Sequence, residues 1–81
     1  MTYTHFKALH QRRQAEYLAR HGHCLAERQE DSFVLTLYAI EGFYAEIWRS
    51  RGEEPILFIH VFQSSTGLSD YLRLVQLPSN L

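Results

Sequence analysis

The apolar residues of this chain are concentrated in one stretch, residues 33–62, which holds four of the five phenylalanines and the single tryptophan. Within that stretch, residues 33–40 and 43–50 are rich in β-branched and aromatic side chains and flank the dipeptide Glu41-Gly42. Two such runs around a Glu-Gly pair predict two strands joined by a two-residue hairpin turn.

Two further strands extend this hairpin into a four-stranded meander. Residues 23–30 predict a weaker first strand with charge at its far end, as is common at a sheet edge. The last strand is predicted over residues 56–63, after Pro55, where a missing amide donor is tolerated. Closing the hairpin turn places Ile40 opposite Phe43, and the alternation of side chains then makes both faces of the sheet largely apolar.

Helices are predicted on both sides of the meander in the sequence. Residues 4–21 contain neither Gly nor Pro and predict one helix with Thr4 as its N-cap, followed by Gly22 where a positive φ is favoured. A second, short helix is predicted over residues 68–74. The fold class is therefore α+β: an N-terminal helix packed on a four-stranded antiparallel meander, with a short C-terminal helix, in a single domain spanning residues 1–81.

The alternation also predicts which sheet face the N-terminal helix covers. If the loop at residues 51–54 keeps four residues, the covered face carries Leu35, Leu37 and Trp48, whereas a one-residue slip would exchange the two side-chain sets of the last strand. The C-terminal helix covers only part of the other face, and the apolar patch that remains predicts a homodimer. The predicted interface residues are Tyr38, Ile40, Phe43, Ile47, Phe58, His60 and Phe62.

Composition narrows the class of protein. The chain has 81 residues, of which 46% are hydrophobic and 21% charged, as in a folded soluble domain. A lone cysteine, Cys24, excludes an intrachain disulfide, and the sequence shows neither a signal-peptide pattern nor an apolar run long enough to cross a bilayer. We expect a cytoplasmic protein that needs neither a membrane nor a cofactor.

Basic residues gather in the predicted N-terminal helix, although the net charge of the chain is −1. One interpretation is that this helix packs over an acidic rim of the sheet. The alternative is weak binding of an anion or a nucleic acid, for which the net charge and the absence of recognisable RNA- or DNA-binding motifs give little support. The candidate residues for that alternative are Lys7, Arg12, Arg13 and Arg20.

The segment His21-Gly22-His23-Cys24 carries ligand types that bind zinc. A structural zinc site normally needs four ligands, and no second Cys or His pair follows at the required spacing, although His10 or His60 could approach through the fold. The alternative is that these histidines face solvent at a helix-to-strand turn. The segment therefore supports a metal-dependent enzyme only weakly.

Two polar residues lie within the apolar strands. Glu46 could act as an acid or base in an apolar setting, or could pair with an arginine such as Arg13, Arg20 or Arg28. His60 could be a pH-sensitive interface residue or a partly buried histidine with a hydrogen-bond partner. For both residues, the structural interpretation is the simpler one.

Three segments, GHCLAERQ at 22–29, LYAIEGFYAEIW at 37–48 and FQSSTGLSDYL at 62–72, resemble a group of small uncharacterised bacterial single-domain proteins. The resemblance covers about residues 14–74 and implies a stand-alone bacterial domain, but no activity, cofactor or site residue. The sequence thus predicts a non-catalytic homodimeric binding or regulatory module rather than an enzyme.

Overall fold

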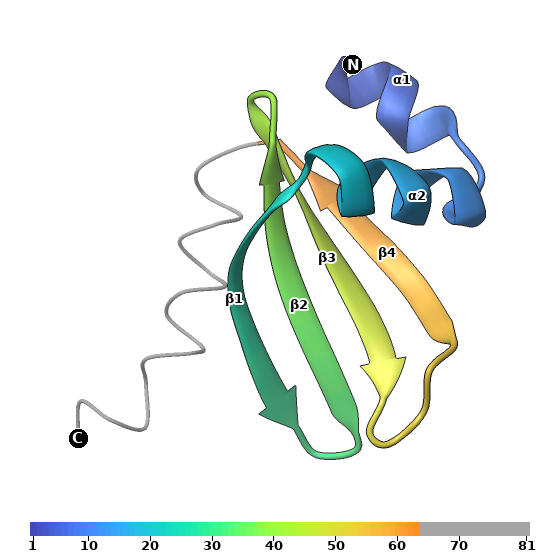
Figure 1. Cartoon of the computed structure of the whole chain (residues 1–81), viewed down its shortest axis with the longest axis vertical. Helices are drawn as coiled ribbons and strands as arrows, with labels where there is room; N and C mark the ends of the chain where they lie inside the picture. The colour runs from blue at the N-terminus through green and yellow to red at the C-terminus, as the bar shows by residue number, and fades with distance from the viewer. Residues whose placement is uncertain (64–81) are drawn as a thin grey trace.

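The structure is a computed structural model that describes residues 1–63 as two helices and four strands (Figure 1). The α+β class and the N-terminal helical layer on a meander are confirmed, whereas the C-terminal helix predicted over residues 68–74 lies outside the described residues. The elements are α1 (Tyr3–Ala8), α2 (Gln11–His21), β1 (His23–Glu30), β2 (Phe33–Ile40), β3 (Phe43–Ser50) and β4 (Ile56–Phe62).

The four strands form one antiparallel sheet in the order β1-β2-β3-β4. Ile40 pairs with Phe43 as predicted, and the register continues without a break to the pair Phe33 and Ser50. Glu41 and Gly42 have φ values of 35° and 93°, the two consecutive positive values that a type I′ turn requires. Local turn chemistry therefore accounts for the central hairpin.

Both outer strands contain a bulge. In β1 the pairing skips Leu25, and in β4 it skips Leu57, so neither leucine has a partner in the neighbouring strand. Their side chains are exposed, by 51% for Leu25 and 46% for Leu57. Because a bulge interrupts the ladder of an edge strand, both edges are poor templates for pairing with another strand.

The bulge at Leu57 shifts the register of β4 by one residue, which is the alternative that the sequence left open. It places Phe58 opposite Trp48 and His60 opposite Glu46, so the side chains of β4 are exchanged between the two faces relative to the expected register. Ile59 then pairs with Ile47.

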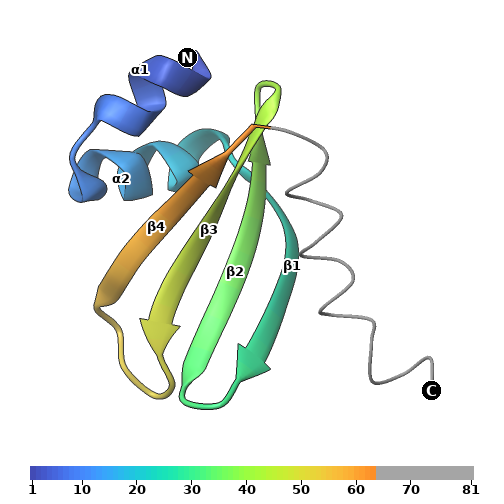
Figure 2. The same ribbon diagram turned by 180° about the vertical axis from the view of Figure 1, so that it is seen from behind.

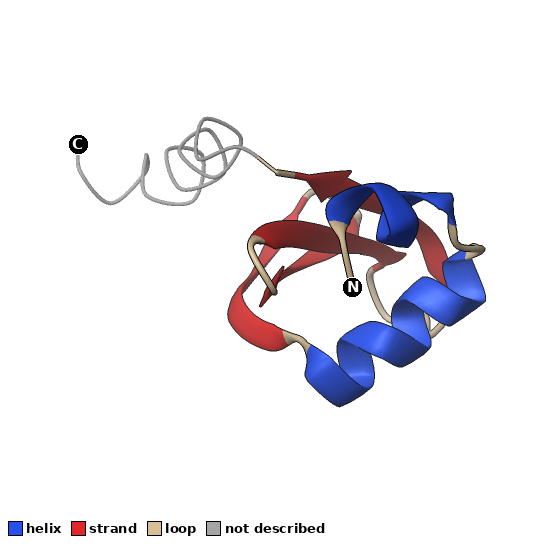
Figure 3. Ribbon diagram, turned by 90° about the horizontal axis from the view of Figure 1, so that it is seen from above, coloured by secondary structure: helices blue, strands red, loops and turns tan. Residues whose placement is uncertain are grey.

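The predicted covered face is wrong: α1 and α2 both lie on the other face of the sheet, near the β2–β3 turn (Figures 1 and 3). That face is apolar near the turn, whereas the opposite face carries Glu46 and His60 in its middle row. Packing the helices on the apolar face buries its side chains against Phe6 and Leu18, which is favourable. The cluster beneath the helices consists of Phe6, Leu18, Ile40, Phe43, Ala45, Ile47 and Val61.

The single helix predicted over residues 4–21 is also wrong, because Leu9 and His10 are extended, with ψ values of 152° and 153°. In one straight helix, Phe6 and Leu18 would lie about 120° apart around the axis. The break lets both side chains enter the core, where both are fully buried. The buried Gln14 bridges the break, since its Nε2 donates to the carbonyl of Phe6 at 3.0 Å.

Both predicted helix ends differ in detail from the structure. The N-cap is Thr2 rather than Thr4, and its hydroxyl accepts a hydrogen bond from the amide of His5 at 3.1 Å. Gly22 has a φ of −82°, so it is not needed for a left-handed conformation. A Cβ atom there would lie 2.8 Å from the carbonyl oxygen of Leu18 and 3.1 Å from Tyr38, so close packing explains the glycine.

We expect Phe43→Ala to lower the free energy of unfolding by about 3–5 kcal/mol, because it removes a fully buried ring from the cluster under the helices. Urea denaturation measures the effect. Leu57→Ala is the control, and its exposed position predicts a change of only about 0.5 kcal/mol. Equal losses in the two variants would contradict the assignment of the covered face.

Candidate functional site

The sheet face turned away from both helices is the first candidate site, and we call it the open face (Figure 2). Cross-strand pairing arranges it in three rows that run from β2 to β4. The rows are Leu35, Trp48 and Phe58; Leu37, Glu46 and His60; and Ala39, Tyr44 and Phe62.

Aromatic rings stack along the β3–β4 half of the open face. The rings of Trp48 and Phe58 lie 5.0 Å apart at an interplanar angle of 21°, and those of Tyr44 and Phe62 lie 5.5 Å apart at 24°. His60 contacts Phe62 at 5.2 Å between ring centroids. Phe58 is nevertheless 46% exposed. These five side chains form a preorganised aromatic strip that remains open to a partner.

Glu46 lies between the two stacked pairs and is only 6% exposed. Its Oε1 accepts a hydrogen bond from Trp48 Nε1 at 2.8 Å and lies 3.9 Å from His60 Nδ1. These contacts replace the arginine pairing that the sequence suggested. Because the indole donates to the carboxylate, Glu46 holds the ring of Trp48 in place, which is a positioning role.

The structure divides the predicted interface residues between the two faces. Ile40, Phe43 and Ile47 are buried under the helices, and Tyr38 packs against the same cluster. Phe58, His60 and Phe62 lie on the open face through their pairing with β3. Tyr44 and Trp48 are their neighbours on this face. The sequence placed these two residues on the opposite face from Phe58 and Phe62, because the bulge at Leu57 was not predicted.

The second candidate site is a groove of about 550 Å³ along α2. Arg13 and Arg20 are seven residues apart, close to two helical turns, so they lie on the same side of α2. The other two predicted basic residues, Lys7 and Arg12, do not line the groove, and Lys7 donates to the hydroxyl of Tyr3 at 3.2 Å. The lining residues are Met1, Leu9, Arg13, Glu16, Tyr17, Arg20 and His21.

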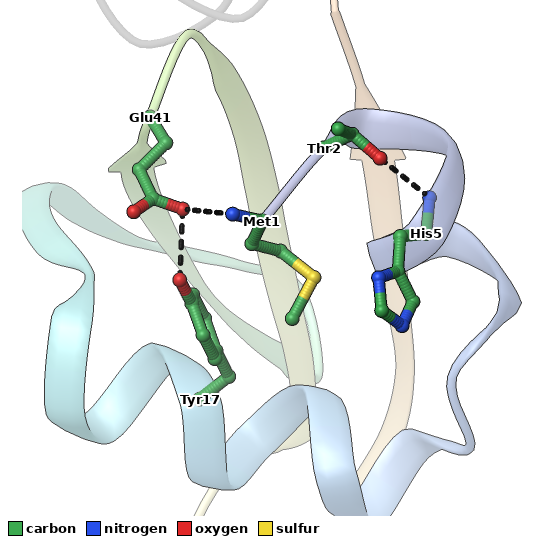
Figure 4. Close-up of polar contacts among 5 residues, drawn as sticks. All are labelled: Met1, Thr2, His5, Tyr17 and Glu41. Atoms are coloured by element: carbon green, nitrogen blue, oxygen red, sulfur yellow. Dashed lines mark hydrogen bonds and ion pairs between the residues drawn. The ribbon is translucent and has the colours of Figure 1, made fainter.

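A polar cluster around Glu41 includes Met1 and Tyr17, two of the residues that line this groove (Figure 4). The Tyr17 hydroxyl donates to Glu41 Oε1 at 2.8 Å, and the amino group of Met1 lies 3.2 Å from the same oxygen. The hydrogen bond from Tyr17 and the adjacent amino group lower the pKa of the Glu41 carboxyl. The same hydrogen bond raises the pKa of Tyr17. The cluster joins α2 and the start of α1 to the β2–β3 turn.

The predicted metal ligands do not come together as a site in the described part of the chain. His21, His23 and Cys24 are all exposed, and the ring of His21 packs on Tyr17 at 4.6 Å between centroids. Within residues 1–63, no three His, Cys, Asp or Glu side chains lie close enough together to hold a metal ion.

Comparison with known proteins finds no matching family model, no matching curated protein and no matching solved structure. Among the helices of residues 1–63, none has the length and apolar character needed to span a membrane. The geometry of the two candidate sites is therefore the guide to function.

We expect the Glu41 cluster to make stability depend on pH. A lowered carboxyl pKa stabilises the fold above the usual glutamate value of about 4.3, and this contribution is lost as the pH falls through the folded pKa. Glu41→Gln should therefore lower the melting temperature at pH 7, and lower it by less at pH 3. Glu53→Gln, at an exposed glutamate in the β3–β4 loop, is the control. A deficit of equal size at both pH values would contradict the electrostatic role of Glu41.

Proposed function

We propose that this protein is a non-catalytic binding module that forms a homodimer through the β3–β4 half of its open face. The observation that carries the proposal is the stacked pair of Trp48 and Phe58, in which Phe58 is 46% exposed on a sheet face that neither α1 nor α2 covers. Aromatic side chains each bury about 150–250 Å² when covered, so this strip gains more from a partner than scattered surface apolar residues do.

The strip has the properties of an interface centre. Trp and Tyr are enriched among the residues that contribute most to binding, and the strip contains both, at Trp48 and Tyr44. Because stacking and the Glu46 hydrogen bond already restrict the rings, little side-chain entropy is lost when a partner binds. A rigid aromatic surface of this kind suits a protein partner.

The polar groups of this surface suit a second copy of the chain. Glu46 and His60 occupy neighbouring positions in one row, so a twofold-related copy can place its histidine near the glutamate of the first. The bulges at Leu25 and Leu57 disfavour the alternative of pairing strand edges. Face-to-face packing of two sheets is then the arrangement that covers the aromatic strip.

The test compares two charge substitutions at side chains of similar exposure. Phe58→Asp puts a carboxylate into the aromatic strip of the proposed interface, whereas Leu25→Asp puts it on the bulged edge of β1. Analytical ultracentrifugation over a concentration series should show a dimer for the parent chain and Leu25→Asp, and a monomer for Phe58→Asp. A monomeric parent chain, or a dimer that survives Phe58→Asp, would overturn the proposal.

The groove along α2 supports a second candidate function, binding of an anionic ligand. It places Arg13 and Arg20 together beside an apolar wall formed by Leu9. An anion with an apolar part, or the backbone of a single-stranded nucleic acid, has the matching chemistry.

Fluorescence anisotropy with a labelled single-stranded RNA tests this candidate, with tripolyphosphate as competitor. We expect binding that weakens as salt rises, is lost in the double variant Arg13→Glu/Arg20→Glu, and persists in Arg12→Glu/Lys7→Glu. The control pair carries the same charge change outside the groove. Equal losses in both double variants would mean attraction by overall charge and no site in the groove.

A further inference from the structure

The two halves of the open face differ in exposure. On β2, Leu35 and Leu37 are fully buried, at 0% exposure, although both face away from the helices. In the same rows on β4, Phe58 is 46% exposed and the side chain of His60 is 60% exposed. Side chains in a sheet stand roughly perpendicular to it, so neighbouring side chains on the same face shield the sides of a leucine but not its tip. The full burial of Leu35 and Leu37 therefore calls for cover from above the sheet.

We infer that the β1–β2 half of the open face is the docking site of the chain's own C-terminal segment, centred on residues 68–75. This inference goes beyond the proposed dimer, since it concerns the other half of the face and holds for a monomer as well. The segment would lie over Leu35 and Leu37, beside Trp48, and leave the other four residues of the aromatic strip free.

The apolar residues of this segment follow a helical pattern. Four of the five recur at positions i, i+3, i+4 and i+7, which places these four within about 100° of one another on a helix, and Leu74 would flank them. Ser69, Asp70 and Arg73 would fall on the opposite side of such a helix. The apolar stripe consists of Leu68, Tyr71, Leu72 and Val75.

The chain length fits the distance to be covered. β4 ends at Phe62, in the row of Tyr44 and Ala39, at the β2–β3 turn end of the sheet (Figure 2). Strands lie about 4.8 Å apart, so β2 is about 10 Å from β4, and the linker 63–67 can span about 16 Å. An eight-residue helix is about 12 Å long and matches the length of β2 from Ala39 to Leu35, about 14 Å.

The single tryptophan reports on this docking, because Trp48 shares a row with Leu35. We propose to compare the full-length chain with Leu72→Glu, which breaks the apolar stripe, and with Ser69→Glu, which adds the same charge on the predicted polar side. The measurements are the emission maximum of Trp48 and its quenching by acrylamide, over a dilution series. Circular dichroism confirms that each variant keeps its sheet.

If the segment docks in cis, Leu72→Glu shifts the emission to the red and increases quenching at every concentration, whereas Ser69→Glu matches the parent chain. Equal quenching in all three proteins would overturn the inference. Shielding that disappears on dilution of the parent chain would also overturn it, since the cover would then come from a second copy, as in the proposed dimer. Loss of the dimer with concentration-independent shielding would instead refute only the proposed function. If Leu72→Glu loses its sheet, Tyr71→Glu takes its place in the comparison.

Discussion

The packing of Phe6 against Phe43 is the contact on which the rest of this structure depends. The two rings lie 5.4 Å apart and are both fully buried, and they join the first helix to the first residue of β3. To reach this position, the chain breaks its helix at Leu9 and His10 and turns α2 so that Leu18 enters the same cluster. A domain of this size has one small core. Here α1 and α2 both pack on the same side of the sheet to form it.

The open face is the direct consequence. A sheet whose two faces are both apolar, with α1 and α2 on the same one, leaves a second surface that favours cover. The halves of that surface have different chemistry: aliphatic side chains on β2, and stacked aromatic rings around Glu46 on β3 and β4. The aliphatic half suits an apolar segment of the chain itself. The aromatic half suits a preorganised protein interface.

The polar interactions of this fold position its elements and side chains, and contribute less to its stability. The Glu41 cluster lies at the surface, where exposed ion pairs contribute little to stability, yet it joins both helices to the β2–β3 turn. Glu46 orients Trp48 on the opposite face. The bulges at Leu25 and Leu57 protect both edges of the sheet, so its faces are the surfaces available for association.

The sequence by itself determined the four strands, their order and the register of the central hairpin, because these follow from local alternation and from the turn at Glu41-Gly42. It did not determine the helix break, the bulge at Leu57 or the face that the helices cover. Each of these depends on contacts between distant residues: Phe6 and Leu18 meet only in the folded core, and one extra residue in β4 exchanges its side chains between the faces. Since both faces were apolar, only tertiary packing could decide which became the core and which stayed open.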